Sequence, residues 1–276
     1  NLAGVDGLNG AAAVVVSGDG AQVYVAGSSD NALVAFARDG ATNELTLLDL
    51  ERNGFGGVTG LLGPDGLALS NDGKHLYAAA AGSSSVAIFG RDNSAASATF
   101  GELEFVGEVR DGVDGVDGLA LARALVLSPD GAHLYVVGEA DNAVAALARD
   151  ASDGTLDFVE FHTDGVGGVS GLAGARAVAI SPDGAQVYVA GGTANAVALF
   201  TRQTSNASPD FGKLTFVTAY VDGAAGVDGL QGAAAILVSP DPVGSDPGGQ
   251  HVYVAGRGED AVAVFTRNEL TGALTW

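Results

Sequence analysis

The chain of 276 residues contains no cysteine, no methionine and only two lysines, Lys74 and Lys213. Without cysteine it can form no disulfide framework, no thiolate nucleophile and no cysteine metal site. No run of 18 apolar residues occurs, which predicts that no helix spans a membrane. The sequence shows no Gly-x-Ser-x-Gly elbow, His-Glu-x-x-His helix or phosphate-binding loop, so the common hydrolase and nucleotide-binding motifs are missing.

Positive charge is also scarce, since 33 acidic residues stand against 12 basic ones and the formal net charge is −21. Such a chain repels phosphate backbones, which argues against nucleic-acid binding. The same charge favours solubility, divalent cations and basic partners.

The sequence does contain one repeated motif, which is present in five copies. Its opening serine recurs at steps of 53, 58, 53 and 58 residues, and a strand tyrosine and a later arginine keep the same register. The serines are Ser17, Ser70, Ser128, Ser181 and Ser239. A steady period of this length means that one supersecondary unit is stacked repeatedly.

Each unit holds four short apolar segments separated by Gly, Asn and Asp turns, as in 175–181, 185–190, 196–201 and 214–219. Four antiparallel strands per repeat are typical of a propeller blade. The sequence therefore predicts an all-β, five-bladed β-propeller forming a single domain over 1–276, with blades near 8–58, 61–116, 119–169, 172–227 and 230–276. Because a ring removes exposed sheet edges, we expect the last blade to close on the first.

One aligned position, at the start of the innermost strand, breaks the repetition. It holds Ala12, Asp65, Arg123, Arg176 and Ala234 in the five copies. Asp65, Arg123 and Arg176 are thus predicted to lie together at the channel mouth, where two arginines could clamp a carboxylate or phosphate. The alternative is that they pair with Asp65 and neighbouring carboxylates and plug the channel.

The glycine-rich loops that enter the inner strands carry many short oxygen side chains. Asp, Asn, Ser and Thr followed by Gly are ordinary turn formers, and this structural role is one interpretation. The other is a rim of carboxylates that collects Ca²⁺, a cation that takes six to eight oxygen ligands. The candidate ligands are Asp6, Asp111, Asp114, Asp117 and Asp228.

The histidines and aligned serines give no sign of a catalytic site. His75, His133 and His251 share one aligned position on three different blades, so we expect exposed histidines at strand edges. The aligned serines precede turns in every copy and are predicted to be structural.

The phrase Ser-Pro-Asp-Gly-x-x-[Val/Leu]-Tyr-Val, at 128–136 and 181–189, resembles the YVTN and lactonase-like β-propeller repeats, as does Asp-Asn-Ala-Val-Ala at 141–145. The resemblance implies a propeller of the kind found in surface and exported proteins and in 6-phosphogluconolactonase-like enzymes. Those enzymes are typically seven-bladed, and the motif encodes blade geometry rather than catalytic residues.

The favoured function on these grounds is a non-catalytic binding or scaffold propeller that holds a protein partner, or a larger assembly, through its loop faces. A location outside the cell, at its surface or in the periplasm fits this hypothesis. One alternative is a lactonase-like hydrolase at the channel mouth. Another is a carbohydrate-binding propeller, because Asp and Asn recur at the turn between the second and third strands of the repeats.

Overall fold

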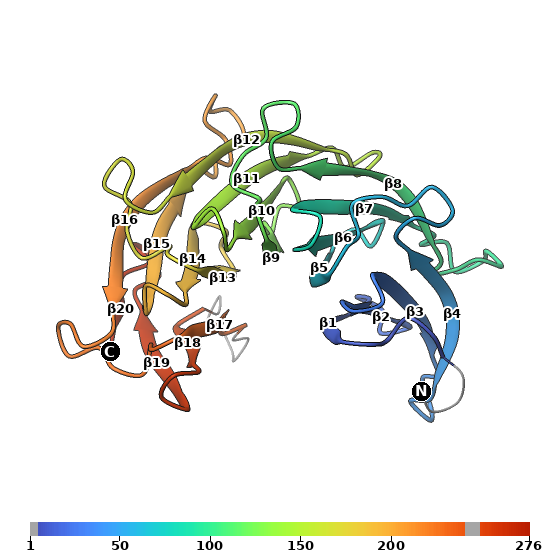
Figure 1. Ribbon diagram of the computed structural model, residues 1–276, viewed down its shortest axis with the longest axis horizontal. Coiled ribbons are helices and arrows are strands. Elements are labelled where there is room, and N and C mark those ends of the chain that lie inside the picture. Colours follow the sequence, from blue (N-terminus) through green and yellow to red (C-terminus); the bar gives the residue numbers. More distant parts are fainter. Residues whose placement is uncertain (1–4, 241–248) are drawn as a thin grey trace.

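The computed structural model describes residues 5–240 and 249–276, which form twenty strands in five sheets. Each sheet has four antiparallel strands in chain order, and each is one blade of a propeller (Figure 1). The predicted all-β fold with five blades is therefore confirmed.

The strand bounds repeat closely from blade to blade. Blade 1 contains β1 (Ala11–Val16), β2 (Gln22–Gly27), β3 (Ala32–Arg38) and β4 (Leu45–Arg52). Blade 2 contains β5 (Pro64–Leu69), β6 (His75–Ala80), β7 (Ser85–Arg91) and β8 (Leu103–Arg110). Blade 3 contains β9 (Ala122–Leu127), β10 (His133–Gly138), β11 (Ala143–Arg149) and β12 (Leu156–Thr163). Blade 4 contains β13 (Ala175–Ile180), β14 (Gln186–Gly191), β15 (Ala196–Arg202) and β16 (Leu214–Val221). Blade 5 contains β17 (Ala233–Val238), β18 (His251–Gly256), β19 (Ala261–Arg267) and β20 (Leu274–Thr275).

The repeated serine fixes the turn between the first and second strands. Ser181 Oγ donates to Asp183 Oδ1 at 2.5 Å and accepts from the Gln186 N–H at 3.0 Å, while Gly184 supplies the positive φ of +70°. The same bonds form at Ser17, Ser70 and Ser128. At these four positions the predicted structural role of the serine is confirmed.

Neighbouring blades are joined by a buried hydrogen-bonded set that we call the clasp. In blade 2, the Tyr77 hydroxyl donates to the Gly154 carbonyl at 3.0 Å and accepts from Arg149 Nε of blade 3 at 2.8 Å. Tyr24, Tyr135 and Tyr188 do the same with Arg91, Arg202 and Arg267. The four clasp tyrosines are fully buried, so each hydroxyl group needs a hydrogen-bond partner within the protein.

The histidines expected at exposed edges belong to this clasp instead. His75 and His133 are buried, and their Nδ1 atoms lie 2.7 Å and 3.1 Å from the Nη2 atoms of Arg149 and Arg202. Gln22 and Gln186 fill the same place in blades 1 and 4. Burial, followed by the arginine charge, lowers the pKa of both histidines. The expectation was wrong for these two residues because the next blade covers the second strand.

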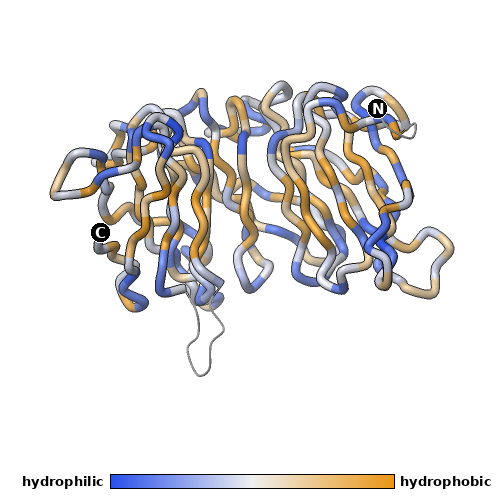
Figure 2. Tube along the Cα trace, turned by 90° about the horizontal axis from the view of Figure 1, so that it is seen from below, coloured by the Kyte–Doolittle hydropathy of each residue, from blue (hydrophilic) through white to orange (hydrophobic). Residues whose placement is uncertain are grey.

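The apolar parts of the strands lie in the middle of each blade, and the polar loops lie on the two faces (Figure 2). The sheets of successive blades pack through small side chains such as Ala79 of β6, Ala122 of β9 and Ala145 of β11. None of the strands or connections that the structure describes forms a helix that could cross a bilayer.

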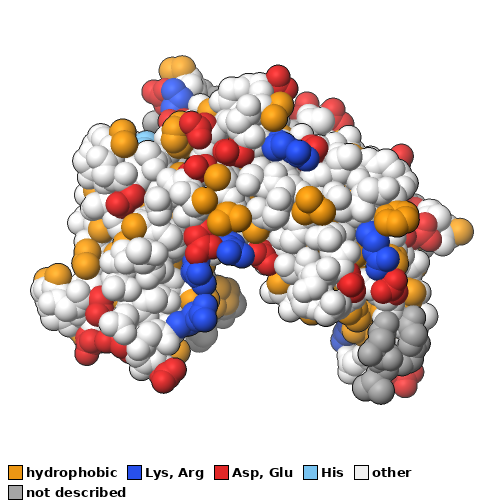
Figure 3. Space-filling view, viewed as in Figure 1, with side chains coloured by type: hydrophobic (Ala, Val, Ile, Leu, Met, Phe, Trp, Pro, Cys, Tyr) orange, Lys and Arg blue, Asp and Glu red, His pale blue; other side chains and the backbone are white. Residues whose placement is uncertain are grey.

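The expectation of a closed ring was wrong. The five blades form an arc with an opening between β17 and β1 (Figures 1 and 3). Val14 of β1 is 65% exposed, although its counterpart Leu125 in blade 3 is 8% exposed, and Val262 of β19 is 64% exposed. Packing between neighbours fixes the rotation from blade to blade, and five such rotations do not complete the circle.

Candidate functional site

The three mouth residues predicted from the sequence do lie together. Arg123 Nη1 is 2.5 Å from Asp65 Oδ2 of the preceding blade, and Ser28 Oγ donates to Asp65 Oδ1 at 3.1 Å. Arg176 reaches the same group of charges through a fourth residue, Glu139. Its Nη2 lies 2.6 Å from Glu139 Oε1, while Arg123 Nε lies 2.5 Å from Glu139 Oε2.

A β-bulge places each of the three side chains. Asp65, Arg123 and Arg176 are each the second residue of an inner strand, at the point where the register with the second strand shifts. A bulge leaves one residue unpaired and redirects its side chain, and bulges are common next to functional sites. We call Asp65, Arg123, Glu139 and Arg176 the mouth cluster.

Glu139 and Arg257 were not predicted from the sequence. Both occupy the residue just after the second strand, an aligned position that holds Ser28, Ala81, Glu139, Gly192 and Arg257. The signal was present, because a charged residue at an otherwise small position stands out.

A cavity of about 330 Å³ adjoins the mouth cluster on its blade 5 side. It is lined by Arg176, Gly192, Thr193, Gly232, Arg257 and Gly258. A side chain at Gly192 would lie 3.3 Å from Arg176 Cδ, so the glycine keeps this wall open. Basic side chains gather along the inner edge of the arc (Figure 3).

Positive charge is in excess at this cavity. Arg123 is balanced by two carboxylates, whereas Arg176 uses one nitrogen on Glu139. Arg257 is exposed and forms no ion pair with any residue that the structure describes. The cavity is therefore suited to an anionic group or to a developing oxyanion.

The Glu139 carboxylate of the mouth cluster is held in its charged form. Burial alone would raise the pKa of Glu139, but the hydrogen bonds from Arg123 and Arg176 outweigh it and hold that pKa below its usual value. Burial opposes the charge of Arg123 as well, and the bonds to Glu139 and Asp65 raise its pKa. The cluster is thus a fixed array of charges rather than a neutral plug.

The candidate calcium ligands do not form one site. Asp111 and Asp117 join Asp141, and Asp228 joins Asp222 and Glu259, with the carboxylate oxygens of each group within 4.8 Å of one another. Asp6 instead pairs with Arg52 at 2.9 Å, and Asp114 is a turn residue with a φ of +53°. Asp111 and Asp222 also accept from the N–H of Leu119 and Leu230, both at 2.9 Å, so turn capping is part of their role.

The recurrent Asn and Asp residues between the second and third strands are turn formers. Asn31, Asn142, Asn195 and Asp260 all adopt a positive φ of 51–53°. The Oδ1 atoms of Asn31, Asn142 and Asn195 accept from glycine N–H groups at the start of the next blade's inner strand. Their side chains therefore join blades in the structure.

Comparison with known proteins gives the family. The sequence model described as "Lactonase, 7-bladed beta-propeller" matches residues 2–109 and 117–220. The fold is similar to that of a periplasmic gluconolactonase from Pseudomonas aeruginosa, with 22% identity, a TM-score of 0.70 and coverage of 95% of this chain and 68% of that one.

Two further solved structures are similar. A protein from Lactobacillus plantarum is 22% identical with a TM-score of 0.74, over 96% of this chain and 69% of that one. A putative 6-phosphogluconolactonase from Bacteroides fragilis is 21% identical with a TM-score of 0.62, over 95% and 81%. No curated protein sequence matches the chain.

The sequence-based preference for a non-catalytic scaffold was wrong. It rested on the presence of five blades where the enzymes typically have seven and on the few charged residues near the channel mouth, whereas the family match and the lactonase-like neighbours favour the hydrolase alternative. The family's repeat encodes blade geometry, so the absence of a short catalytic motif excludes little. The chain belongs to the lactonase family of seven-bladed β-propellers.

Proposed function

We propose that the protein hydrolyses a sugar lactone at the mouth cluster and the adjoining cavity. The observation that carries the proposal is the family match over residues 2–109 and 117–220. It is supported by the charged residues that the bulges bring to the channel mouth, where Arg176 and Arg257 line a cavity with uncompensated positive charge. A periplasmic location accords with the similar gluconolactonase.

The chemistry needs stabilisation of negative charge and a proton acceptor. Water adds to the lactone carbonyl carbon, the ring C–O bond breaks, and the products are a carboxylate, a hydroxyl group and one released proton. We assign Arg176 and Arg257 to the oxyanion that forms on the carbonyl oxygen. Glu139, which bonds Arg176, accepts the proton of the attacking water and returns a proton to the leaving ring oxygen.

Proton release from D-glucono-1,5-lactone at constant pH, corrected for spontaneous hydrolysis, tests the proposal. Glu139→Gln and Arg176→Gln should each lower kcat/KM by about 100-fold, because one removes the proton acceptor and the other an oxyanion donor. Lys213→Gln is the matched control, since Lys213 pairs with Asp210 on an exposed loop. Equal activity in all three variants, or no activity above background in the unaltered chain, would refute the proposal.

A further inference from the structure

Most of the grooves between the outer strands of successive blades are filled by a side chain. Asp49 of β4 accepts from the N–H of Leu103, the first residue of β8, at 2.9 Å. Glu160 of β12 does the same for Leu214, the first residue of β16, at 2.6 Å. Each acceptor stands four residues after the first residue of its own strand.

The groove between blades 4 and 5 is closed by a phenol instead. The Tyr220 hydroxyl accepts from the N–H of Leu274, the first residue of β20, at 2.7 Å. Its ring lies 6.1 Å from that of Phe265, between centroids. Tyr220 stands six residues after the first residue of β16. In these three grooves, therefore, a side-chain oxygen accepts a hydrogen bond from the outward-facing N–H of the next outer strand.

The groove between β8 and β12 has no such side chain. Gly107 occupies the place of Asp49 and Glu160, and Val109 occupies the place of Tyr220. Among the residues that the structure describes, no side chain accepts a hydrogen bond from the N–H of Leu156, the first residue of β12. A Cβ atom at Gly107 would meet nothing within 4 Å, so the space that the side chain fills elsewhere is open here.

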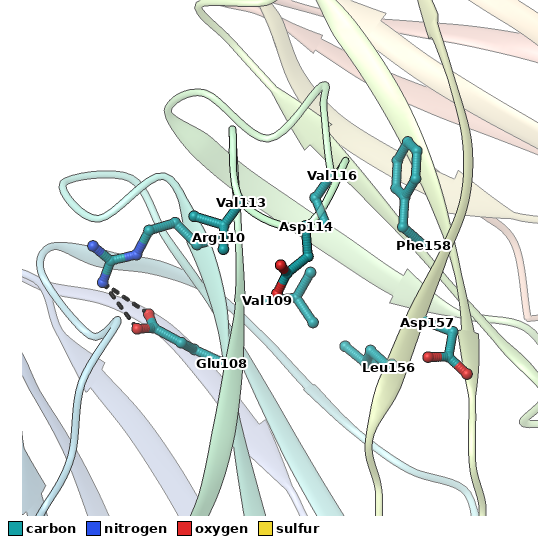
Figure 4. A pocket seen from close by; sticks show the side chains of 9 residues that line it. All are labelled: Glu108, Val109, Arg110, Val113, Asp114, Val116, Leu156, Asp157 and Phe158. Carbon is teal, nitrogen blue, oxygen red and sulfur yellow. Dashed lines mark hydrogen bonds and ion pairs between the residues drawn. The ribbon is translucent and has the colours of Figure 1, made fainter.

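A cavity of about 700 Å³ occupies this groove. Figure 4 shows Val109 and Leu156 pointing toward one another, with Val116 and Phe158 beside them. Glu108 is paired with Arg110 at 3.0 Å, which leaves Asp114 and Asp157 as the uncompensated charges of the lining. Apolar side chains therefore form part of the wall, and the unpaired charge around them is negative, which disfavours an anionic occupant.

We propose that this groove binds a small neutral phenol. The ring would pack on Val109, Val116 and Phe158, and the hydroxyl oxygen would accept from the Leu156 N–H, as the Tyr220 hydroxyl does from Leu274. A carboxylate would satisfy the same N–H but would meet Asp114 and Asp157. The inference is independent of the lactonase proposal, because the groove lies at the outer edge of the arc and the mouth cluster at its inner edge.

Binding of p-cresol, which has the shape of a tyrosine side chain, tests the proposal by amide NMR titration. We expect a dissociation constant on the order of 1 mM. The largest shift should be at the Leu156 N–H. Toluene, which lacks the hydroxyl group, should bind about tenfold more weakly because the Leu156 N–H then stays unpaired. Equal affinity for the two compounds, or no shift at 10 mM p-cresol, would overturn the proposal.

A variant that fills the groove from within supplies the second test. Val109→Tyr should place a phenol where Tyr220 stands in blade 4, raise the melting temperature by a few degrees and abolish p-cresol binding. Val106→Tyr is the matched control, since Val106 is on the same strand, is 41% exposed and does not line the cavity. Unchanged p-cresol binding in a folded Val109→Tyr variant would show that the ligand binds elsewhere and would disprove the assignment.

Discussion

At the scale of single residues, the clasp arginines are charged side chains in buried positions. The side chains of Arg149, Arg202 and Arg267 are 1–2% exposed, and each pairs with an aspartate of the preceding blade's serine turn. Asp72 lies 2.9 Å from Arg149 and also accepts from Ser70. Burial alone would raise the pKa of Asp72, but these hydrogen bonds outweigh it and lower the pKa to about 2.

Stability should therefore depend on pH through Asp72. Because its pKa is lower in the folded chain than in the unfolded one, the stabilisation is present above the unfolded value near 4 and is lost as the pH falls to about 2. Asp72→Asn should lower the free energy of unfolding by about 1 kcal/mol at pH 7, allowing for partial exposure. Urea unfolding at pH 7, 4 and 2.5 measures this.

The difference from the unaltered chain should shrink toward pH 2.5. Asp157→Asn is the control, because Asp157 is exposed and forms no ion pair with another described residue. A loss from Asp72→Asn that is the same at all three pH values would show that the charge of Asp72 is not the cause.

At the scale of elements, the same clasp explains why each blade needs the next. The hydroxyl of Tyr135 donates to the Gly212 carbonyl at 2.7 Å and accepts from Arg202 Nε at 2.7 Å. Tyr253, the corresponding residue of blade 5, has no following blade among the described residues and is 36% exposed. The sequence repeats the tyrosine faithfully, but the structure gives it two different environments.

Removing one hydroxyl should therefore have two different effects. Tyr135→Phe leaves a buried arginine nitrogen and a carbonyl unpaired, so it should lower the free energy of unfolding by about 2 kcal/mol. Tyr253→Phe should change it by less than about 0.5 kcal/mol. Denaturant unfolding of the two variants compares them directly, and equal losses would contradict a role for the clasp in joining blades.

At the scale of the whole molecule, the arc presents an apolar face on each side of its opening. Val14 and Val16 are exposed on blade 1, and Leu237, Val262 and Val264 on blade 5. In the inner blades the corresponding side chains are covered by a neighbour, as Leu125 and Leu127 are. Contiguous apolar surface of this kind is a site of association.

When these five blades are expressed alone, they should consequently self-associate through these faces. Val14→Lys combined with Val262→Lys should shift sedimentation velocity profiles toward the monomer, because both charges would have to be desolvated on contact. Val166→Lys is the matched control, since Val166 is an equally exposed valine on a loop of the middle blade. If the double variant and the control sediment alike, the open faces do not drive association.

Part of the site could be predicted from the sequence. The aligned position of Asp65, Arg123 and Arg176 was enough to place them together, because aligned residues of a repeat lie at the same distance from the propeller axis. Glu139 was within reach of the same alignment. The sequence could not predict that the rim carboxylates divide into separate groups, or that the groove beside Gly107 is empty. Both properties depend on how adjacent blades are rotated.

The sequence by itself determined the strands, the five repeats and the residues that face the axis, because turn chemistry and apolar alternation act within a few residues. Only the tertiary structure decided that the ring is open, that His75 and His133 are buried and that one outer groove is unfilled. These properties arise between blades, where the packing of some 50 residues against the next 50 sets an angle that no single repeat contains.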